Sequence, residues 1–193
     1  MTITYERFAQ GMTLDEYRAQ MTRNRERFEE NERTVELSAD DIDFFARLAQ
    51  PLNVMVITED WCGDAIANVP TLGRLAAESG KLNLRVFLRD QNTDLIDQYL
   101  KNGVHRSIPV FAFFDAEFRP IGHWIERPAK MTELQSQMVD QLYANDPAFK
   151  GVAPGTSMAV MPEAARTRLS QAFSAFRAET RSFADREVLR EVR

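Results

Sequence analysis

One side chain in this sequence stands out as a sulfur nucleophile, because Cys62 is the only cysteine. The short, apolar and β-branched segment 52–58 (LNVMVIT) predicts a buried strand, and residues 62–79 predict a helix that begins at the cysteine. Unpaired N–H groups and the helix dipole stabilise a thiolate at a helix start, so we expect a lowered thiol pKa and raised reactivity. The alternative is an inert thiol, since a lone cysteine is often a small buried hydrophobe.

A proline at the head of another predicted strand provides a second marker. The run Ser107-Ile108-Pro109-Val110 follows the cysteine and opens the apolar segment 109–114. Taken together, Trp61-Cys62-Gly63, the Ile108-Pro109 pair and the order of strands resemble the thioredoxin superfamily. That superfamily has the motif Trp-Cys-Gly-Pro-Cys and a cis-proline as its second signature. The resemblance covers about residues 52–142, and the variant Trp-Cys-Gly-Asp is similar to a bacterial thioredoxin-like branch.

The resemblance implies a site around one catalytic thiol, Cys62. Trp61 would form an apolar wall, and Gly63 would let the turn bend and leave the sulfur open. A cis Ile108–Pro109 bond would place the Ile108 backbone opposite the sulfur, where an extended substrate peptide could pair with it. With Asp64 beside the thiol, the predicted substrate-binding residues are Trp61, Gly63, Asp64, Ile108 and Pro109.

Three positions depart from the motif. Ala65 stands where thioredoxins carry the second, resolving cysteine, so an internal dithiol cycle is impossible. Asp64 replaces the proline of the motif, and we expect its charge to oppose the thiolate, although its side chain can turn toward water and be screened. Val56 stands where many thioredoxins have a buried proton-transferring aspartate. Glu59 and Asp60, which precede the turn, are expected to be solvated charges.

The remaining pattern predicts an α/β protein with a mixed central sheet flanked by helices, the thioredoxin-like fold. Strands are predicted over 82–89, 109–114 and 121–125, with a short helix over 93–101 between the first two. Thr13 and Glu16 form a capping box before a helix with apolar residues as far as Phe28, and Ser38 begins a second helix. Pro128 begins a helix after the sheet, and Pro162 begins a last helix that carries several phenylalanines.

We expect these elements to form one domain with two appendages. The predicted segments are a helical N-terminal extension over 1–50, a core over 51–145, and a loop with a C-terminal helical extension over 146–193. The two extensions carry net charges of opposite sign, which allows them to pack together.

Composition excludes several classes of function. With 24 Lys and Arg against 29 Asp and Glu, a net charge of −5 predicts no nucleic-acid binding. The longest apolar run, 108–114, is far short of the roughly 20 residues that span a bilayer, so we expect no membrane segment. No secretory signal is evident over 1–20, and with a single cysteine we expect a cytoplasmic location. Two histidines and one cysteine predict no metal site.

Two functions from different classes fit the sequence. The first is a monothiol thiol–disulfide oxidoreductase, in which Cys62 attacks a protein or small-molecule disulfide and an external low-molecular-weight thiol such as glutathione resolves the product. No other cofactor is expected. The second is a binding or scaffolding module that lost redox chemistry with the second cysteine, and its extensions would supply the partner surface. A homodimer through the extensions is a further expected assembly.

Overall fold

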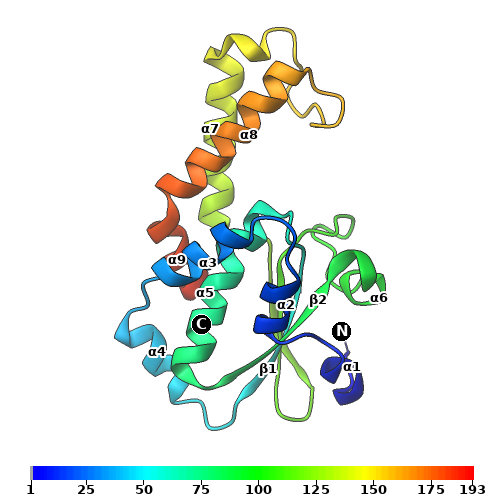
Figure 1. Ribbon diagram of the computed structural model, residues 1–193, viewed down its shortest axis with the longest axis vertical. Helices are drawn as coiled ribbons and strands as arrows, with labels where there is room; N and C mark the ends of the chain where they lie inside the picture. The colour runs from blue at the N-terminus through cyan, green and yellow to red at the C-terminus, as the bar shows by residue number, and fades with distance from the viewer. Residues whose placement is uncertain (1) are drawn as a thin grey trace. The chain divides into compact units, whose positions relative to one another are not determined.

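The computed structural model describes residues 2–193, and Figure 1 shows the arrangement of its helices and strands. In chain order the elements are α1 (Tyr5–Ala9), α2 (Leu14–Gln20), α3 (Arg25–Thr34), α4 (Ala39–Ala46), β1 (Leu52–Thr58), α5 (Gly63–Ser79), β2 (Leu82–Leu88), the 3₁₀ turn η1 (Arg89–Gln91), α6 (Thr93–Ile96), β3 (Val110–Phe114), β4 (Pro120–Ile125), α7 (Ala129–Asn145), the 3₁₀ turn η2 (Pro147–Phe149), α8 (Glu163–Glu179) and α9 (Arg181–Val192).

The four strands form one mixed sheet in the order β2-β1-β3-β4. β1 and β2 run parallel, whereas β3 lies antiparallel to both β1 and β4. The predicted α/β class with a mixed sheet is confirmed, and each strand lies within about one residue of its predicted range. Because α5 connects two parallel strands, it must cross one face of the sheet. The helix starts a few residues after β1, so its first turn lies near the end of that strand.

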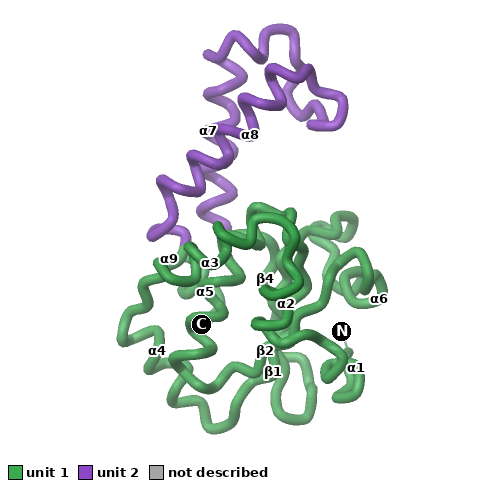
Figure 2. The backbone as a smooth tube through the Cα atoms, viewed as in Figure 1, with its two compact units in different colours: residues 1–127, 185–193 green, residues 128–184 purple. Residues whose placement is uncertain are grey.

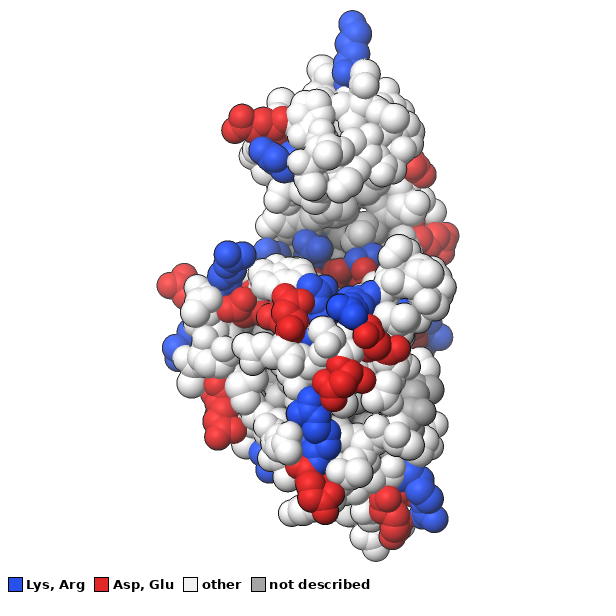
Figure 3. Space-filling model, turned by 90° about the vertical axis from the view of Figure 1, so that its right-hand side faces the viewer, with Lys and Arg blue, Asp and Glu red and all other residues white. Residues whose placement is uncertain are grey.

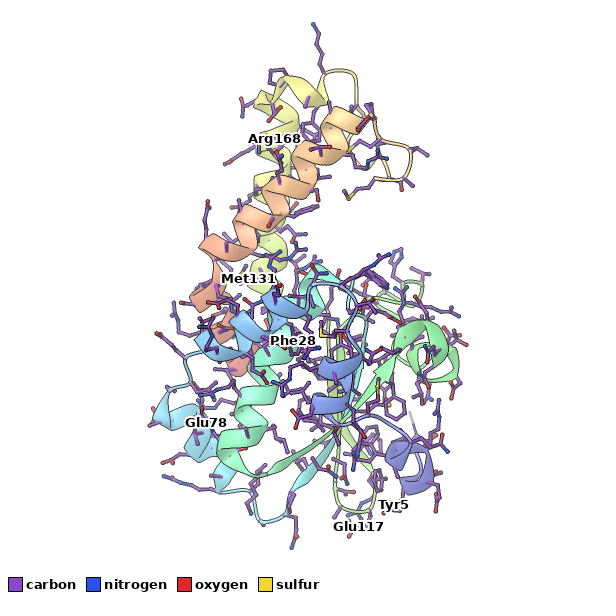
Figure 4. All side chains as sticks on the ribbon, viewed as in Figure 1. Tyr5, Phe28, Glu78, Glu117, Met131 and Arg168 are labelled. Carbon is purple, nitrogen blue, oxygen red and sulfur yellow. The ribbon has the colours of Figure 1, made fainter. Side chains whose placement is uncertain are left out.

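Two apolar layers sandwich the sheet. Alternate residues of each strand point to opposite faces, so Val54 and Val56 contact α5 whereas Met55 and Ile57 face the other way. The first layer also receives α3, whose Phe28 points toward the core in Figure 4, and two fully buried residues of α9, Val188 and Leu189. The second layer is closed by side chains of α1 and α6.

The helix after the cysteine has a clear start and end. Cys62 is the N-cap of α5 with an extended backbone, and its carbonyl accepts from Ile66 N at 3.0 Å. Gly80 ends the helix with φ of 64°, the left-handed conformation that glycine adopts without steric cost. The helix continues through Pro70 for 17 residues. The first turn of a long helix therefore lies directly beside the sulfur.

The N-terminal helices differ from the sequence prediction. One helix was expected from Thr13 to Phe28, but the chain forms α2 and α3 with a break between them. The break has a physical cause outside the segment: the carboxylate of Asp60 accepts from the backbone N–H of Thr22 at 2.8 Å and of Arg23 at 3.0 Å. These amides are thus bonded to the loop before Cys62. Helix α1, which was not predicted, contributes Phe8 to the second apolar layer.

Two later helices also differ from their predictions. The helix expected over 93–101 ends at Ile96, because the next amides bond three residues back: Gln98 N to Leu95 O at 3.1 Å and Tyr99 N to Ile96 O at 2.9 Å. The single last helix is two helices, α8 and α9, divided at Thr180.

Contacts divide the chain into two compact units, coloured separately in Figure 2. Unit 1 comprises residues 1–127 and 185–193, and unit 2 comprises residues 128–184. Unit 1 contains the sheet and both apolar layers. Unit 2 contains α7 and α8 around its own small core of Phe149, Met161, Ala165 and Leu169. The division predicted from sequence, at residues 50 and 145, rests on the order of predicted elements and remains a prediction.

The surface is mixed in charge. On the face drawn in Figure 3, acidic and basic side chains stand next to one another. Within residues 2–193, none of the helices combines the length and the apolar character needed to cross a membrane.

Candidate functional site

The sulfur of Cys62 lies between the start of α5 and the segment before β3. Its Sγ donates to the carbonyl of Ile108 at 3.4 Å, across 46 residues of sequence. The Ile108–Pro109 peptide bond is cis. Cys62 is half-buried, whereas Ile108 and Pro109 are buried. The structure therefore brings together Cys62, Gly63, Ile108 and Pro109, which the sequence had placed in one site.

Trp61 stands at the open side of this group. Its side chain is 41% exposed, and the guanidinium of Arg89 lies over its ring with 4.7 Å between the guanidinium carbon and the ring centroid. Such a cation–π contact is worth about 0.5–1 kcal/mol at an exposed site. Trp61 therefore presents an apolar surface beside the thiol, and Arg89 covers part of that surface.

The Asp64 side chain is buried and paired, and does not turn toward water. The residue is only 8% exposed, and one carboxylate oxygen accepts from the guanidinium of Arg127, which follows β4. Burial lowers the pKa of Arg127, but hydrogen bonding to Asp64 and the negative charges of Asp64, Glu126 and Cys62 outweigh it and raise that pKa overall. The charge beside the thiol is therefore an ion pair and not an isolated carboxylate.

Glu59 also departs from its prediction. Its side chain is 8% exposed, and Oε1 accepts from the backbone N–H of Asp90 at 2.9 Å. Burial is the main cause of its raised pKa, and the negative charges of Asp90 and Asp60 add to it. Asp60 bonds to the α2–α3 connection described above. Both acids are thus structural parts of the loop before Cys62, and the expectation of solvated charge is wrong for Glu59.

The burial of Glu59 predicts a pH effect on stability. Because its native pKa lies above the ordinary value of 4.5, its contribution to the unfolding free energy is full below that value and is lost as pH rises through the native pKa. The variant Glu59→Gln keeps an oxygen that can accept from the Asp90 N–H and removes the titratable carboxyl group. Denaturant unfolding between about pH 4 and about pH 7 should therefore show a smaller loss of stability in the variant.

A matched control for this measurement is Glu36→Gln, since Glu36 is exposed. The control should follow the wild-type pH dependence. If the unfolding free energy of Glu59→Gln has the same pH dependence as that of wild type, the Glu59 carboxylate is not destabilised by its environment.

A buried hydroxyl lies beneath the same loop. Tyr17 of α2 is fully buried, and burial strongly raises its pKa, with further contributions from the charges of Asp60, Glu59 and Cys62. Thr58, the last residue of β1, is also fully buried. Two buried hydroxyl side chains thus lie in α2 and at the end of β1, and Tyr17 interacts electrostatically with Cys62.

Other polar and apolar residues around the sheet have structural roles. Arg106 forms a two-bond ion pair with Asp97, at 2.6 and 2.8 Å. His123 packs edge-on against Tyr99. Val56 and Ala65 are fully buried. Across residues 2–193, no three His, Cys, Asp or Glu side chains are grouped in a way that could hold a metal ion.

Sequence reasoning missed Arg127 and Tyr17. Arg127 is 63 residues from Asp64, and nothing in its neighbourhood distinguishes it from the chain's many other arginines. Tyr17 has helical spacing with Leu14 and Met21 and was assigned only to an apolar stripe. Neither carries a local signal for its place beside the thiol.

Comparison with known proteins agrees with this fold. A family model described as thioredoxin matches residues 11–140. A protein of unknown function from Pseudomonas aeruginosa has a similar structure, with a TM-score of 0.63 at 16% identity over 91% of this chain and 96% of that one. An HIV epitope scaffold aligns with a TM-score of 0.60 at 16% identity over the same shares. No curated protein matches in sequence. Because the family model covers the whole sheet and the Cys62 region, this chain belongs to the thioredoxin family.

Proposed function

We propose that this protein is a monothiol thiol–disulfide oxidoreductase of the cytoplasm, with Cys62 as its nucleophile. The observation that supports the proposal most is the position of Sγ, at the N-cap of a 17-residue helix and 3.4 Å from the Ile108 carbonyl. The helix start favours the thiolate form. The segment of Ile108 and Pro109 offers backbone groups to an extended substrate, as in strand addition.

The proposed reaction needs two external thiols. The Cys62 thiolate attacks one sulfur of a disulfide R–S–S–R′, forms a mixed disulfide Cys62–S–S–R and releases R′–S⁻. A first low-molecular-weight thiolate such as glutathione attacks the mixed disulfide at the R sulfur and releases the Cys62 thiolate. A second glutathione converts the resulting R–S–S–glutathione to R–SH and glutathione disulfide. The substrate disulfide gains two electrons, which come from the two glutathione molecules.

The test uses the whole chain and a peptide disulfide-linked to glutathione. We expect wild-type protein with glutathione to release peptide thiol catalytically, and Cys62→Ser to reduce release to the uncatalysed background. Mass spectrometry after brief reaction without glutathione should show one adduct, at Cys62. Ser107→Ala serves as a control because it alters a hydroxyl near Pro109 and leaves the thiol in place. A wild-type chain that neither forms the adduct nor accelerates release would contradict the proposal.

A second function is favoured by a separate feature of unit 2. A groove of about 490 Å³ lies between α7 and α8, lined by apolar residues such as Met138, Leu142 and Phe176 and by the charged Arg168 and Glu179. Arg168 is labelled on α8 in Figure 4. In this second proposal the chain is a redox-inactive binding or scaffolding module. A partner whose affinity is equal for wild type and Cys62→Ser would favour it.

A further inference from the structure

The turn after β4 connects both sides of the thiol site. Glu126 has φ of 72°, a left-handed backbone that is uncommon outside glycine. Its N–H donates to the Pro109 carbonyl at 2.7 Å, and its own carbonyl accepts from the Asn68 side chain of α5 at 2.9 Å. One residue thus bonds to the Pro109 segment and to α5, and the chain reversal at this point sends Arg127 back toward the first turn of α5.

Arg127 forms ion pairs with two carboxylates. Its guanidinium donates to Asp64 in the first turn of α5 and to Glu126 at 2.7 Å. The side chains of Arg127, Asp64 and Glu126 are only 16%, 12% and 18% exposed, so solvent screens these pairs less than it would on an open surface. Glu126 also pairs with Lys101. The guanidinium therefore remains charged and fixed in place close to the thiol.

Arg127 and Tyr17 interact electrostatically with Cys62, and further charged groups lie on the elements beside it. Asp64 comes from α5, Arg127 and Glu126 from the turn after β4, and Tyr17 from α2; Glu59 and Asp60 come from the loop before the cysteine. Arg127 is the cation of this set. A carboxylate disfavours a nearby thiolate, whereas a guanidinium favours it. The two members of the ion pair therefore act on Cys62 in opposite directions: Asp64 disfavours its thiolate form and Arg127 favours it.

We propose that Arg127 is a positioning residue for Cys62: by pairing with Asp64 it cancels the carboxylate charge beside the sulfur and holds the Pro109 turn against the start of α5. The proposal deepens the proposed function, because a full Asp64 charge beside the sulfur would raise the thiol pKa and leave a smaller fraction of Cys62 as thiolate at neutral pH.

The experiment measures the Cys62 titration in four proteins through thiolate absorbance or the pH dependence of alkylation. Arg127→Gln leaves Asp64 without its cation and should raise the thiol pKa by about half a unit to one unit. Asp64→Asn removes the carboxylate charge nearest the thiol, leaves Arg127 paired with Glu126, and should lower that pKa by a similar amount. The double variant loses both charges and should titrate close to wild type. A purely structural role would give no such opposite shifts.

Two further variants keep the test decisive. Arg127→Lys retains the charge without the planar fork, so its thiol pKa should lie much closer to that of wild type than the raised pKa of Arg127→Gln. Arg119→Gln removes an exposed arginine of the β3–β4 turn and should leave the titration unchanged. If Arg127→Gln does not fold, Asp64→Asn and Arg127→Lys still decide the matter: an unchanged pKa in Asp64→Asn overturns the proposal.

The readout separates this proposal from the proposed function. Titration needs no disulfide substrate, so the opposite shifts can be found in a protein that turns over no disulfide. Conversely, full glutathione-dependent turnover with identical pKa values in wild type, Asp64→Asn and Arg127→Gln would retain the oxidoreductase and reject the role of Arg127.

Discussion

Ala65→Cys should convert the protein into a dithiol reductase. Residue 65 lies three positions after the N-cap cysteine, on the same side of the first turn of α5, where side chains stand about 5–6 Å apart at Cβ. A disulfide needs about 3.5–4.5 Å between its Cβ atoms, so the two residues must approach each other slightly as the bond forms. The new thiol would attack the mixed disulfide at Cys62 within the same molecule. We expect turnover with a protein disulfide to rise on the order of tenfold or more, because an intramolecular step replaces a bimolecular one.

Ala67→Cys is the matched control for this variant. It also adds one thiol to α5, but five residues from Cys62, where a side chain points to a different face of the helix. Mass spectrometry under mild oxidation should detect an internal disulfide in Ala65→Cys and none in Ala67→Cys. Failure of Ala65→Cys to form the disulfide would mean that residue 65 does not face the sulfur, and that its match to the second thioredoxin cysteine is wrong.

Leu189→Ala should cost unit 1 a large part of its stability. Leu189 of α9 is fully buried in the layer that also contains Phe28, Val54 and Leu72. Truncating a buried leucine typically costs about 2–5 kcal/mol, against a total of about 5–15 kcal/mol for a domain. We expect a fall of about 2–4 kcal/mol in the unfolding free energy, or roughly 5–15 °C in the melting temperature.

The control for Leu189→Ala is Ile121→Ala in β4. Ile121 is 59% exposed, so its truncation should change the unfolding free energy by no more than about 0.5 kcal/mol. Denaturant unfolding followed by circular dichroism compares the two variants directly. Equal, small effects would show that α9 does not complete the core of unit 1.

The parts of the fold that were predictable carry their signals locally. β1 is an apolar, β-branched run, and α5 has Gly80 at its end, so both were located within about one residue. Cys62 and Pro109 were placed in one site because a known family combines these two motifs at this spacing. The sheet order follows from the same resemblance and from the short connection that makes β3 and β4 a hairpin.

The unpredicted parts depend on contacts between distant segments. The α2–α3 break arises because Asp60, 38 residues after Thr22, bonds to the connecting amides. The burial of Asp64 and Glu59 depends on Arg127 and Asp90, and local sequence favours exposure for any acid near a turn. The helical pattern over 163–192 gives no sign that its last turns belong to a different compact unit from the first.

The interruption of unit 1 by unit 2 bears on the order of events during protein synthesis. Val188 and Leu189 belong to the core of unit 1, yet the ribosome makes them only after all 57 residues of 128–184. At about 5–20 residues per second, this delay is roughly 3–11 s. During that time, the part of the apolar layer that Val188 and Leu189 will cover is exposed on the nascent chain. Transiently exposed apolar surface of this kind is bound by chaperones.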